Sequence, residues 1–269
     1  MRNAPESRLR INNLSKTYGR HADAHHVLDG ITLDVAAGEV VCLVGPSGAG
    51  KTTLLKCLTG LMKPSSGDVS LDGRVLEGPH SAISVVFQEY TRSLLPWATV
   101  ARNVALPLLA RRMPRRLVQE NVARTLESVG LPGIENRYPW QLSGGMQQRV
   151  AIARALVTEP EVLVMDEPFA SVDAQTRFDL EDLTLRVQRD RGMSVILVTH
   201  DIDEAIYLAD RVVVLSKNPA RVQRILDVNL GVERDQIRTR EHPLFVEHRS
   251  EVLTLIRQSQ KKSLRDERQ

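Results

Sequence analysis

The spacing of apolar residues divides the chain into stretches of different secondary structure. Apolar and polar residues alternate cleanly at 31–35, so the first forty residues are predicted to form antiparallel strands. Residues 68–76 carry Asp72-Gly73 between apolar flanks, which predicts a tight hairpin. The runs at 40–44, 162–165 and 194–198 are almost entirely apolar and predict strands that are buried on both faces. Buried strands of this kind are typical of an α/β fold.

Between two of these buried strands the apolar spacing becomes helical. From 89 to 160 the strand signals disappear, and a further helix is predicted at about 175–189. The apolar positions that share one helical face in the inserted stretch are Leu117, Val118, Val122, Leu126 and Val129. Gly130 follows them and is a helix-ending residue. We therefore expect a helical insertion within an α/β domain.

Composition limits the class of protein. With 269 residues, of which 42% are hydrophobic, the chain can bury the core of one large domain with a subdomain. Its 36 basic and 33 acidic residues give a mixed surface, so we expect no nucleic-acid partner. Apolar runs such as 212–215 are far shorter than the roughly 20 residues that cross a bilayer. Residues 1–6 lack the apolar segment of a signal peptide, so a cytosolic protein is expected. Cys42 and Cys57 are predicted to be reduced core residues.

One stretch carries a chemical motif. Gly45-Pro46-Ser47-Gly48-Ala49-Gly50-Lys51-Thr52 fits the pattern G-x-x-x-x-G-K-[ST], and it lies between a predicted strand and a predicted helix. In such a loop the backbone N–H groups turn around an anion, and the helix adds its positive end. Lys51 then supplies a charge to the outer phosphates, and the Thr52 hydroxyl can reach Mg²⁺. The sequence therefore predicts a nucleotide triphosphate site.

Polar residues follow two other buried strands. Asp166 and Glu167 come directly after 162–165, and His200 follows the strand at 194–198. Because open α/β sheets bind ligands at the carboxyl ends of their strands, these residues are expected to join the phosphate loop in one site. Asp166 could reach Mg²⁺, Glu167 could accept a proton from water, and His200 could meet a terminal phosphate. The alternatives are a merely acidic loop and a histidine that caps the next helix. Tyr18 is either an aromatic residue at a strand end or a ring that stacks on a base.

A second motif points to a family. Leu142-Ser143-Gly144-Gly145-Met146-Gln147-Gln148-Arg149 closely resembles the signature sequence of ATP-binding cassette (ABC) ATPases. The order of motifs along the chain also resembles the complete ABC set: Tyr18, the phosphate loop, Gln88, the signature, Asp166-Glu167, Ser171-Val172-Asp173 and His200. Ser171-Val172-Asp173 differs slightly from the usual Ala-Leu-Asp but keeps the aspartate. The resemblance implies an α/β P-loop NTPase (RecA-like) core with an N-terminal antiparallel β subdomain and an inserted α-helical subdomain.

The resemblance also implies a role for each motif, with ATP and Mg²⁺ as the bound species. Tyr18 would stack on adenine, Glu167 would be the general base, and His200 would stabilise the γ-phosphate region. The nucleotide-binding set would be Tyr18, Gly45, Pro46, Ser47, Gly48, Ala49, Gly50, Lys51, Thr52 and Thr53. Mg²⁺ would be bound by Thr52, Gln88 and Asp166, and Gln88 would also contact the lytic water. Asp173 would be the aspartate of the family's D-loop motif. Leu142, Ser143, Gly144, Gly145 and Gln147 would complete the ATP site of the opposite subunit in a head-to-tail dimer.

Further residues resemble one branch of the family. Phe87-Gln88, Leu94-Leu95-Pro96-Trp97, Trp140-Gln141 and Asn218-Pro219-Ala220-Arg221 are similar to segments of the nitrate, sulfonate and taurine importer ATPases. That resemblance implies an ATP-hydrolysing subunit at the cytoplasmic face of the inner membrane, peripheral to it. Its expected partners are a second copy of itself, integral membrane permease subunits and, indirectly, a solute-binding protein.

The expected domains are a catalytic core at 1–88 and 161–216, a helical signature subdomain at 89–160 and a C-terminal extension at 217–269. Two other functions compete with the importer subunit. A soluble ABC ATPase could act on a non-membrane partner. A small-molecule kinase would explain the phosphate loop but not the signature.

Overall fold

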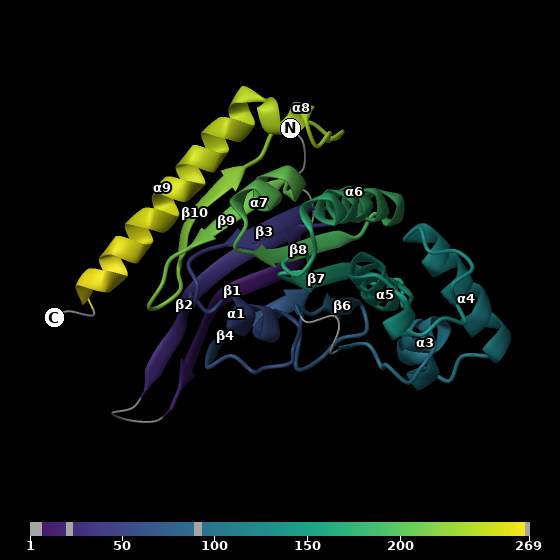
Figure 1. Cartoon of the computed structure of the whole chain (residues 1–269). Helices are drawn as coiled ribbons and strands as arrows, with labels where there is room; N and C mark the ends of the chain where they lie inside the picture. The colour runs from purple at the N-terminus through teal and green to yellow at the C-terminus, as the bar shows by residue number, and fades with distance from the viewer. Residues whose placement is uncertain (1–6, 20–23, 89–92, 267–269) are drawn as a thin grey trace, which may run out of the picture. The chain divides into compact units, whose positions relative to one another are not determined.

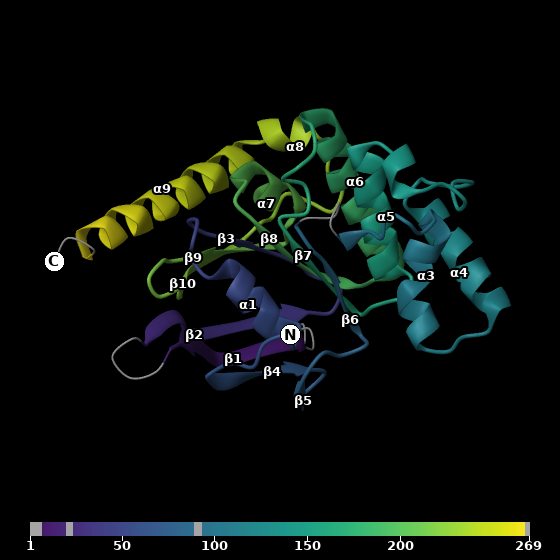
Figure 2. The same cartoon turned by 60° about the horizontal axis from the view of Figure 1, so that its bottom comes forward.

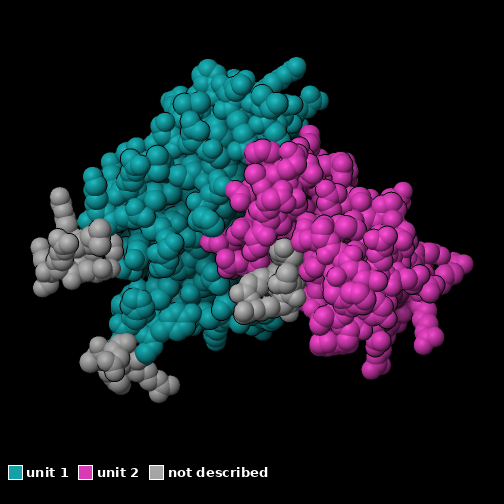
Figure 3. Space-filling model, viewed as in Figure 1, with its two compact units in different colours: residues 1–80, 194–269 teal, residues 81–193 magenta. Residues whose placement is uncertain are grey.

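The structure is a computed structural model that describes residues 7–19, 24–88 and 93–266 (Figure 1). The N-terminal residues 1–6 and the first residues of the expected helical insertion, 89–92, lie outside the described residues. Contacts divide the chain into two compact units, residues 1–80 with 194–269 and residues 81–193, which Figure 3 colours separately.

The first unit contains an antiparallel sheet with the strand order β2-β1-β4-β5. Its strands are β1 (Ser7–Tyr18), β2 (His25–Ala36), β4 (Ser66–Leu71) and β5 (Arg74–Val75). Every second residue at Ile31, Leu33 and Val35 is buried, as the alternation predicts. Asp72 and Gly73 join β4 to β5 with φ values of +46° and +76°. The predicted antiparallel strands and the predicted hairpin are thus confirmed.

The first unit also contains strands of a largely parallel sheet. They are β3 (Val40–Val44), β8 (Ser194–Thr199), β9 (Arg211–Leu215) and β10 (Val222–Asp227), in the order β10-β9-β3-β8. β3 runs parallel to β8 and β9, whereas β10 pairs antiparallel with β9. All residues of β3 and β8 are buried, which explains their uninterrupted apolar runs.

The described residues of this unit form four helices. They are α1 (Lys51–Leu58), α7 (Ile202–Leu208), α8 (Arg238–Glu241) and α9 (Pro243–Asp266). The long C-terminal helix α9 packs against α7 (Figures 1 and 2). Phe245 and Val252 of α9 are fully buried, whereas Leu253 is exposed. Helix α9 therefore contributes to the core of the first unit.

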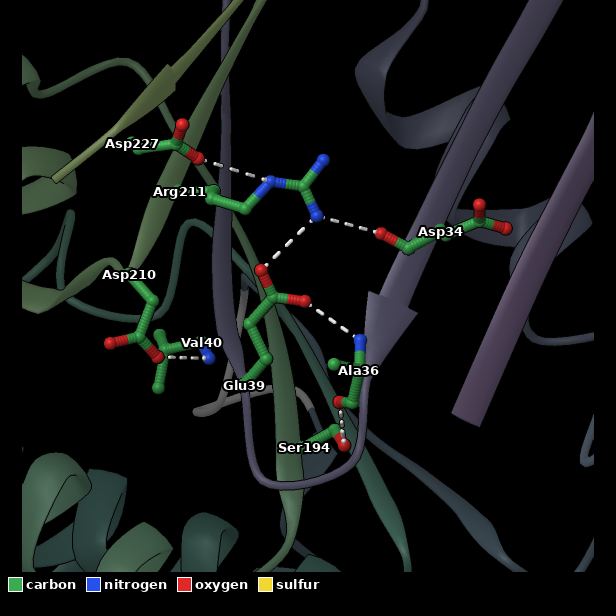
Figure 4. Close-up of polar contacts among 8 residues, drawn as sticks. All are labelled: Asp34, Ala36, Glu39, Val40, Ser194, Asp210, Arg211 and Asp227. Atoms are coloured by element: carbon green, nitrogen blue, oxygen red, sulfur yellow. Dashed lines mark hydrogen bonds and ion pairs between the residues drawn. The ribbon is translucent and has the colours of Figure 1, made fainter. Parts of the chain in front are cut away.

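A polar network holds the amino ends of three strands together (Figure 4). The Arg211 guanidinium at the start of β9 donates to Oε1 of Glu39 at 3.1 Å and to the Asp34 carbonyl at 3.0 Å. The other carboxylate oxygen of Glu39 accepts the Ala36 N–H at 2.7 Å. Ser194, at the start of β8, donates its hydroxyl to the Ala36 carbonyl at 2.8 Å. This network lies at the edge opposite to the carboxyl ends of the strands, so we assign it to stability.

The described residues of the second unit form two parallel strands and several helices. β6 (Ile83–Val86) pairs with β7 (Val162–Asp166), and the helices are α3 (Val100–Ala110), α4 (Arg115–Ser128), the 3-10 helix η2 (Pro139–Gln141), α5 (Gly144–Leu156) and α6 (Ala174–Arg191). The predicted apolar face of α4 is correct for Val118, Val122 and Leu126, which are buried. It is wrong for Leu117, which is 43% exposed because it points away from the face that packs on α3 and α5.

Cys42 and Cys57 are both buried and form no disulfide among the described residues, and burial raises the pKa of the Cys57 thiol. Both are core residues, as predicted. Within the described residues, no helix is long and apolar enough to cross a membrane. The contact-based units place β7 and α6 with the helices of residues 81–193, whereas the sequence assigns 161–216 to the catalytic core. That functional division stays a prediction.

Candidate functional site

The phosphate loop begins where β3 ends. Val44, the last residue of β3, pairs in parallel with Thr199 of β8 and Val214 of β9. Gly45 follows Val44, and α1 begins at Lys51 after the loop. The loop therefore leaves the carboxyl edge of the sheet between two neighbouring strands, which is where parallel sheets place their ligands.

Glycine is required at three positions of this loop, by the backbone angle, by the packing or by both. Gly48 and Gly50 have φ values of +75° and +76°, a region that residues with a Cβ rarely adopt. A Cβ at Gly50 would lie 2.8 Å from Cγ1 of Val27 in β2, and one at Gly45 would lie 3.0 Å from the Leu215 carbonyl oxygen in β9. The spacing of the motif thus matches both the backbone and the packing of the loop. Of the remaining loop residues, Pro46 and Ala49 are buried and Ser47 is exposed.

Lys51 folds back over the loop. Its ammonium donates to the carbonyls of Gly45 at 2.8 Å and Pro46 at 3.1 Å, and the residue is only 7% exposed. Gly50 provides the helix N-cap without a side-chain hydrogen bond, and the first turn of α1, which is described in full, contains no acidic residue. The N-terminal end of α1 and the Lys51 ammonium together give this loop a positive potential that suits a bound anion.

Tyr18 and the two threonines lie around the start of α1. Thr52 is exposed, whereas Thr53 is half-buried and its hydroxyl lies 3.5 Å from the Tyr18 hydroxyl. The Tyr18 hydroxyl also donates to the Met62 sulfur at 3.1 Å, and the Lys16 ammonium lies 5.5 Å from the ring centroid. The structure therefore places Tyr18 both at the end of β1 and beside the phosphate-loop helix.

His200 lies at the same edge of the first unit. It follows Thr199, the β8 residue that pairs with Val44, and its side chain is exposed. The helix that comes next, α7, is capped by Asp201, whose carboxylate accepts the N–H groups of Asp203 and Glu204. The alternative that His200 caps this helix is therefore wrong, because its neighbour provides the cap.

In the second unit, the carboxylates stand at the carboxyl end of β7. Asp166 is buried, and Glu167 directly after it accepts a hydrogen bond from the Gln88 amide at 3.0 Å. Gln88 follows the carboxyl end of β6, which pairs with β7 through Val86 and Met165. Glu167 has a φ of +43°, a rare and strained conformation for a residue with a side chain. The structure thus joins Gln88 and Glu167, which are 79 residues apart in the sequence.

The signature residues form the start of α5. Ser143 is the N-cap and accepts the Met146 N–H at 3.3 Å, while the Gln147 amide donates to the Leu142 carbonyl at 3.2 Å. Gly144 and Gly145 open the helix, and its first turn, described throughout, has no acidic residue. The end of this helix is therefore a second positive site for an anion.

Asp173 caps the next helix, α6. Its carboxylate accepts the Thr176 hydroxyl at 2.6 Å and the Thr176 N–H at 2.9 Å, and these hydrogen bonds lower the pKa of Asp173. Thr176 is one of three residues that sequence reasoning missed. Val27 and Leu215, which enclose the phosphate loop, are the others. No local motif marks Val27 or Leu215, because each meets the phosphate loop only through the fold. Thr176 lies three residues after Asp173, where a helix-capping pattern could have marked it.

A glycine-rich loop between a buried parallel strand and a helix, with a lysine over the loop, defines a P-loop nucleotide-binding protein. Comparison with known proteins identifies the family. The profile of the family described as ABC transporter matches residues 28–170. The aliphatic sulfonates import ATP-binding protein SsuB of Bacillus licheniformis is 42% identical over 245 residues, which cover 91% of this chain and 92% of that protein.

Two further similarities extend the comparison. The taurine import ATP-binding protein TauB of Sinorhizobium fredii is 48% identical over 219 residues, covering 80% of this chain and 81% of that protein. A solved ATP-binding cassette, dimeric and in a post-hydrolysis state with ADP and Pi bound, superposes with a TM-score of 0.72 at 32% identity. That match covers 82% of this chain and 99% of the cassette.

The chain belongs to the ABC transporter family of ATP-binding proteins, and it is an ATPase of that family. The predicted fold class and the predicted resemblance to the branch with sulfonate and taurine relatives are confirmed. The alternative of a soluble ATPase that acts on a non-membrane partner finds no support in these relatives. The roles of the individual site residues stay predictions.

Proposed function

We propose that this chain is the ATP-hydrolysing subunit of an importer and energises the uptake of a small anion of the sulfonate, taurine or nitrate type through a separate permease. The observation that carries the proposal is the built phosphate loop, with Lys51 folded over it, in a chain that matches a sulfonate import ATP-binding protein along nearly its whole length. The loop supports ATP binding, and the relatives support the transport role and the solute class.

ATP would bind with its phosphates on the loop from Gly45 to Lys51 and its adenine on Tyr18. Lys51 would exchange the neutral carbonyls of Gly45 and Pro46 for the outer phosphate oxygens, which are charged and therefore stronger acceptors. The exposed Thr52 hydroxyl and the Asp166 carboxylate are oxygen ligands of the kind that Mg²⁺ prefers, beside phosphates and water. Bound Mg²⁺ would neutralise phosphate charge as the bond to the γ-phosphorus breaks.

Hydrolysis needs a group that takes a proton from water, and we assign Glu167 to it. As water oxygen bonds to the γ-phosphorus, Glu167 accepts the proton, the bond from phosphorus to the bridging oxygen breaks, and ADP leaves. The hydrogen bond from Gln88 holds the Glu167 carboxylate in one orientation, and the strained backbone at Glu167 supports a functional position. His200, exposed after β8, would donate to the γ-phosphate.

The signature helix would serve a second copy of the chain. The first turn of α5, with Ser143, Gly144 and Gly145, would bind the γ-phosphate of ATP held by the phosphate loop of the partner. The solved dimeric cassette with ADP and Pi supports a dimer, and we infer that its two subunits are arranged head to tail. ATP would then close the dimer because it contacts both subunits only in the closed state, and hydrolysis would reopen it.

Two exposed tryptophans support a protein partner for the second unit. Trp97 is 74% exposed, and Trp140 is 70% exposed and stacks on Tyr138 with ring centroids 5.9 Å apart. Large exposed aromatic side chains are enriched at interfaces between proteins. We assign these side chains to the permease contact, which would hold the chain at the cytoplasmic face of the membrane, with a solute-binding protein on the other side.

The test is affinity purification of the tagged protein from detergent-solubilised membranes of its source organism, followed by mass spectrometry. A stoichiometric integral membrane protein with several spans is the expected result, and Trp97→Ala with Trp140→Ala should reduce its recovery. Val232, an exposed apolar residue of the first unit at 77%, provides the matched control as Val232→Ala.

Recovery of soluble partners alone would refute the transport role and leave the ATPase intact. Uptake assays with the recovered complex then test the solute. If the complex imports no sulfonate, taurine or nitrate, the solute class is wrong.

A further inference from the structure

The first turn of α6 contacts the signature residues at the start of α5, within the second unit. A Cβ placed on Gly145 would lie only 2.4 Å from Cγ2 of Thr176, whereas the Thr176 Oγ1 and Cβ would be 3.6 and 3.7 Å away. The Thr176 methyl group therefore fills the space that a side chain at position 145 would need. Ser143, Gly145, Thr176 and Asp179 line the same open cavity of about 380 Å³.

The same threonine is held from its other side. Its hydroxyl donates to Oδ2 of Asp173 at 2.6 Å and its N–H to Oδ1 at 2.9 Å, so both oxygens of one carboxylate are engaged. The N–H bond holds the carboxylate beside Thr176, and the hydroxyl bond to that carboxylate fixes the χ1 rotamer of Thr176. A fixed χ1 determines where the methyl group points. The carboxylate thereby determines which side of Thr176 faces Gly145.

We propose that Thr176 is a positioning residue that fixes the start of α5 relative to Asp173. Its hydroxyl donates to the Asp173 carboxylate, and its methyl group packs against Gly145. The inference rests on the proposed function, in which Gly144 and Gly145 bind the partner's ATP. Because these signature residues are already held in place, they need no further ordering when ATP binds, and closure of the dimer becomes more favourable. Thr176 does not touch the nucleotide in this proposal.

Two conservative substitutions separate the two contacts of the side chain. Thr176→Ser keeps the hydroxyl and loses the methyl group, whereas Thr176→Val keeps the shape and loses the hydroxyl. Thr184 of the same helix is the matched control, because its hydroxyl donates to the Leu180 carbonyl of its own helix at 2.8 Å. Thr184→Val is expected to turn over ATP at the rate of the unmodified chain.

Three quantities are measured for each variant of the full chain: ATP affinity of the phosphate loop, ATP-driven dimerisation in the Glu167→Gln background, and kcat. Both Thr176 variants should bind ATP within about twofold of the parent but lose on the order of tenfold in dimerisation and kcat, because misplaced binding groups lose their pre-organisation. The melting temperature of Gly145→Ala should fall and should recover in Gly145→Ala/Thr176→Ser, where the clashing methyl group is gone.

The outcomes separate this inference from the proposed function. If the Glu167→Gln parent fails to dimerise with ATP, the proposed shared site is wrong and the Thr176 inference falls with it. If the parent dimerises, and both Thr176 variants dimerise and hydrolyse ATP as well as the parent does, only the Thr176 inference is wrong. Equal melting temperatures for Gly145→Ala with and without Thr176→Ser would refute the contact itself.

Discussion

Removing the Glu39 side chain should destabilise the protein without changing its nucleotide chemistry. Glu39 makes an ion pair with Arg211 at 3.1 Å and accepts the Ala36 N–H at 2.7 Å. The side chain of Glu39 is 11% exposed and that of Arg211 is 26% exposed, so both groups are largely withdrawn from water. Because this network joins the amino ends of β3 and β9, its loss should affect unfolding and leave the carboxyl edge intact (Figure 4).

The magnitude follows from the groups left behind by Glu39→Ala. A hydrogen bond to a charged group contributes about 1.5–3 kcal/mol, and the Ala36 N–H loses such an acceptor. Breaking a fully buried ion pair costs about 3–5 kcal/mol, but here Arg211 is partly exposed and keeps the Asp34 carbonyl at 3.0 Å and Asp227 at 3.8 Å. We therefore expect a loss of about 2–4 kcal/mol in the free energy of unfolding. For a chain of this size that lowers the melting temperature by roughly 5–15 °C.

Thermal unfolding followed by circular dichroism measures this change, and two controls interpret it. Glu39→Gln keeps an oxygen for the Ala36 N–H and removes only the charge, so its loss should be intermediate. Arg10→Ala breaks an ion pair to Asp34 whose side chains are 61% and 55% exposed, and such pairs contribute about 0–1 kcal/mol. A melting temperature of Glu39→Ala equal to that of Arg10→Ala would refute the reasoning from burial.

Three other changes test the assigned site and the core. Glu167→Gln should keep ATP binding and lower kcat by roughly 10²–10⁴-fold, because the carboxylate that takes the proton is gone, and single-turnover hydrolysis at the parent rate would exclude Glu167 as the base. Lys51→Ala should weaken ATP binding by about tenfold or more in an equilibrium titration, since a charge-assisted contact is lost, and an unchanged Kd contradicts the phosphate-loop assignment. Gln148 is fully buried, and neither amide atom has a hydrogen-bond partner among the described residues. Gln148→Met should therefore leave the free energy of unfolding unchanged or raise it by about 1 kcal/mol in urea titrations, and a marked loss would mean that the amide is bonded.

Local sequence was sufficient to predict a structural feature wherever the cause of that feature lies in neighbouring residues. The loop from Gly45 to Thr52 is recognisable because glycine is needed at backbone angles such as φ +76° at Gly50, whatever surrounds it. The hairpin at Asp72-Gly73 follows from the same preference. The apolar run at 40–44 predicts a strand because every residue there is buried on one face or the other.

Periodicity alone was less reliable at the edge of a helical face. Leu117 and Val118 are neighbours with the same apolar character, yet Val118 is buried and Leu117 is 43% exposed. Successive residues lie about 100° apart around a helix, so the position of the packing partner decides which of the two is covered. The sequence contains the apolar pattern of the helix, but it does not show against which side of the helix the neighbouring elements pack.

The long-range contacts of the stabilising network and of the site were decided by the tertiary structure. Glu39 and Arg211 are 172 residues apart, and Gln88 and Glu167 are 79 residues apart, yet each pair is in hydrogen-bond contact. Thr176 meets Gly145 for the same reason. Motifs by themselves determined which chemistry this chain carries, because that depends on residue type and short spacing. Only the fold decided which groups hold those motifs in place, because such contacts form between strands and helices that the chain connects over long distances.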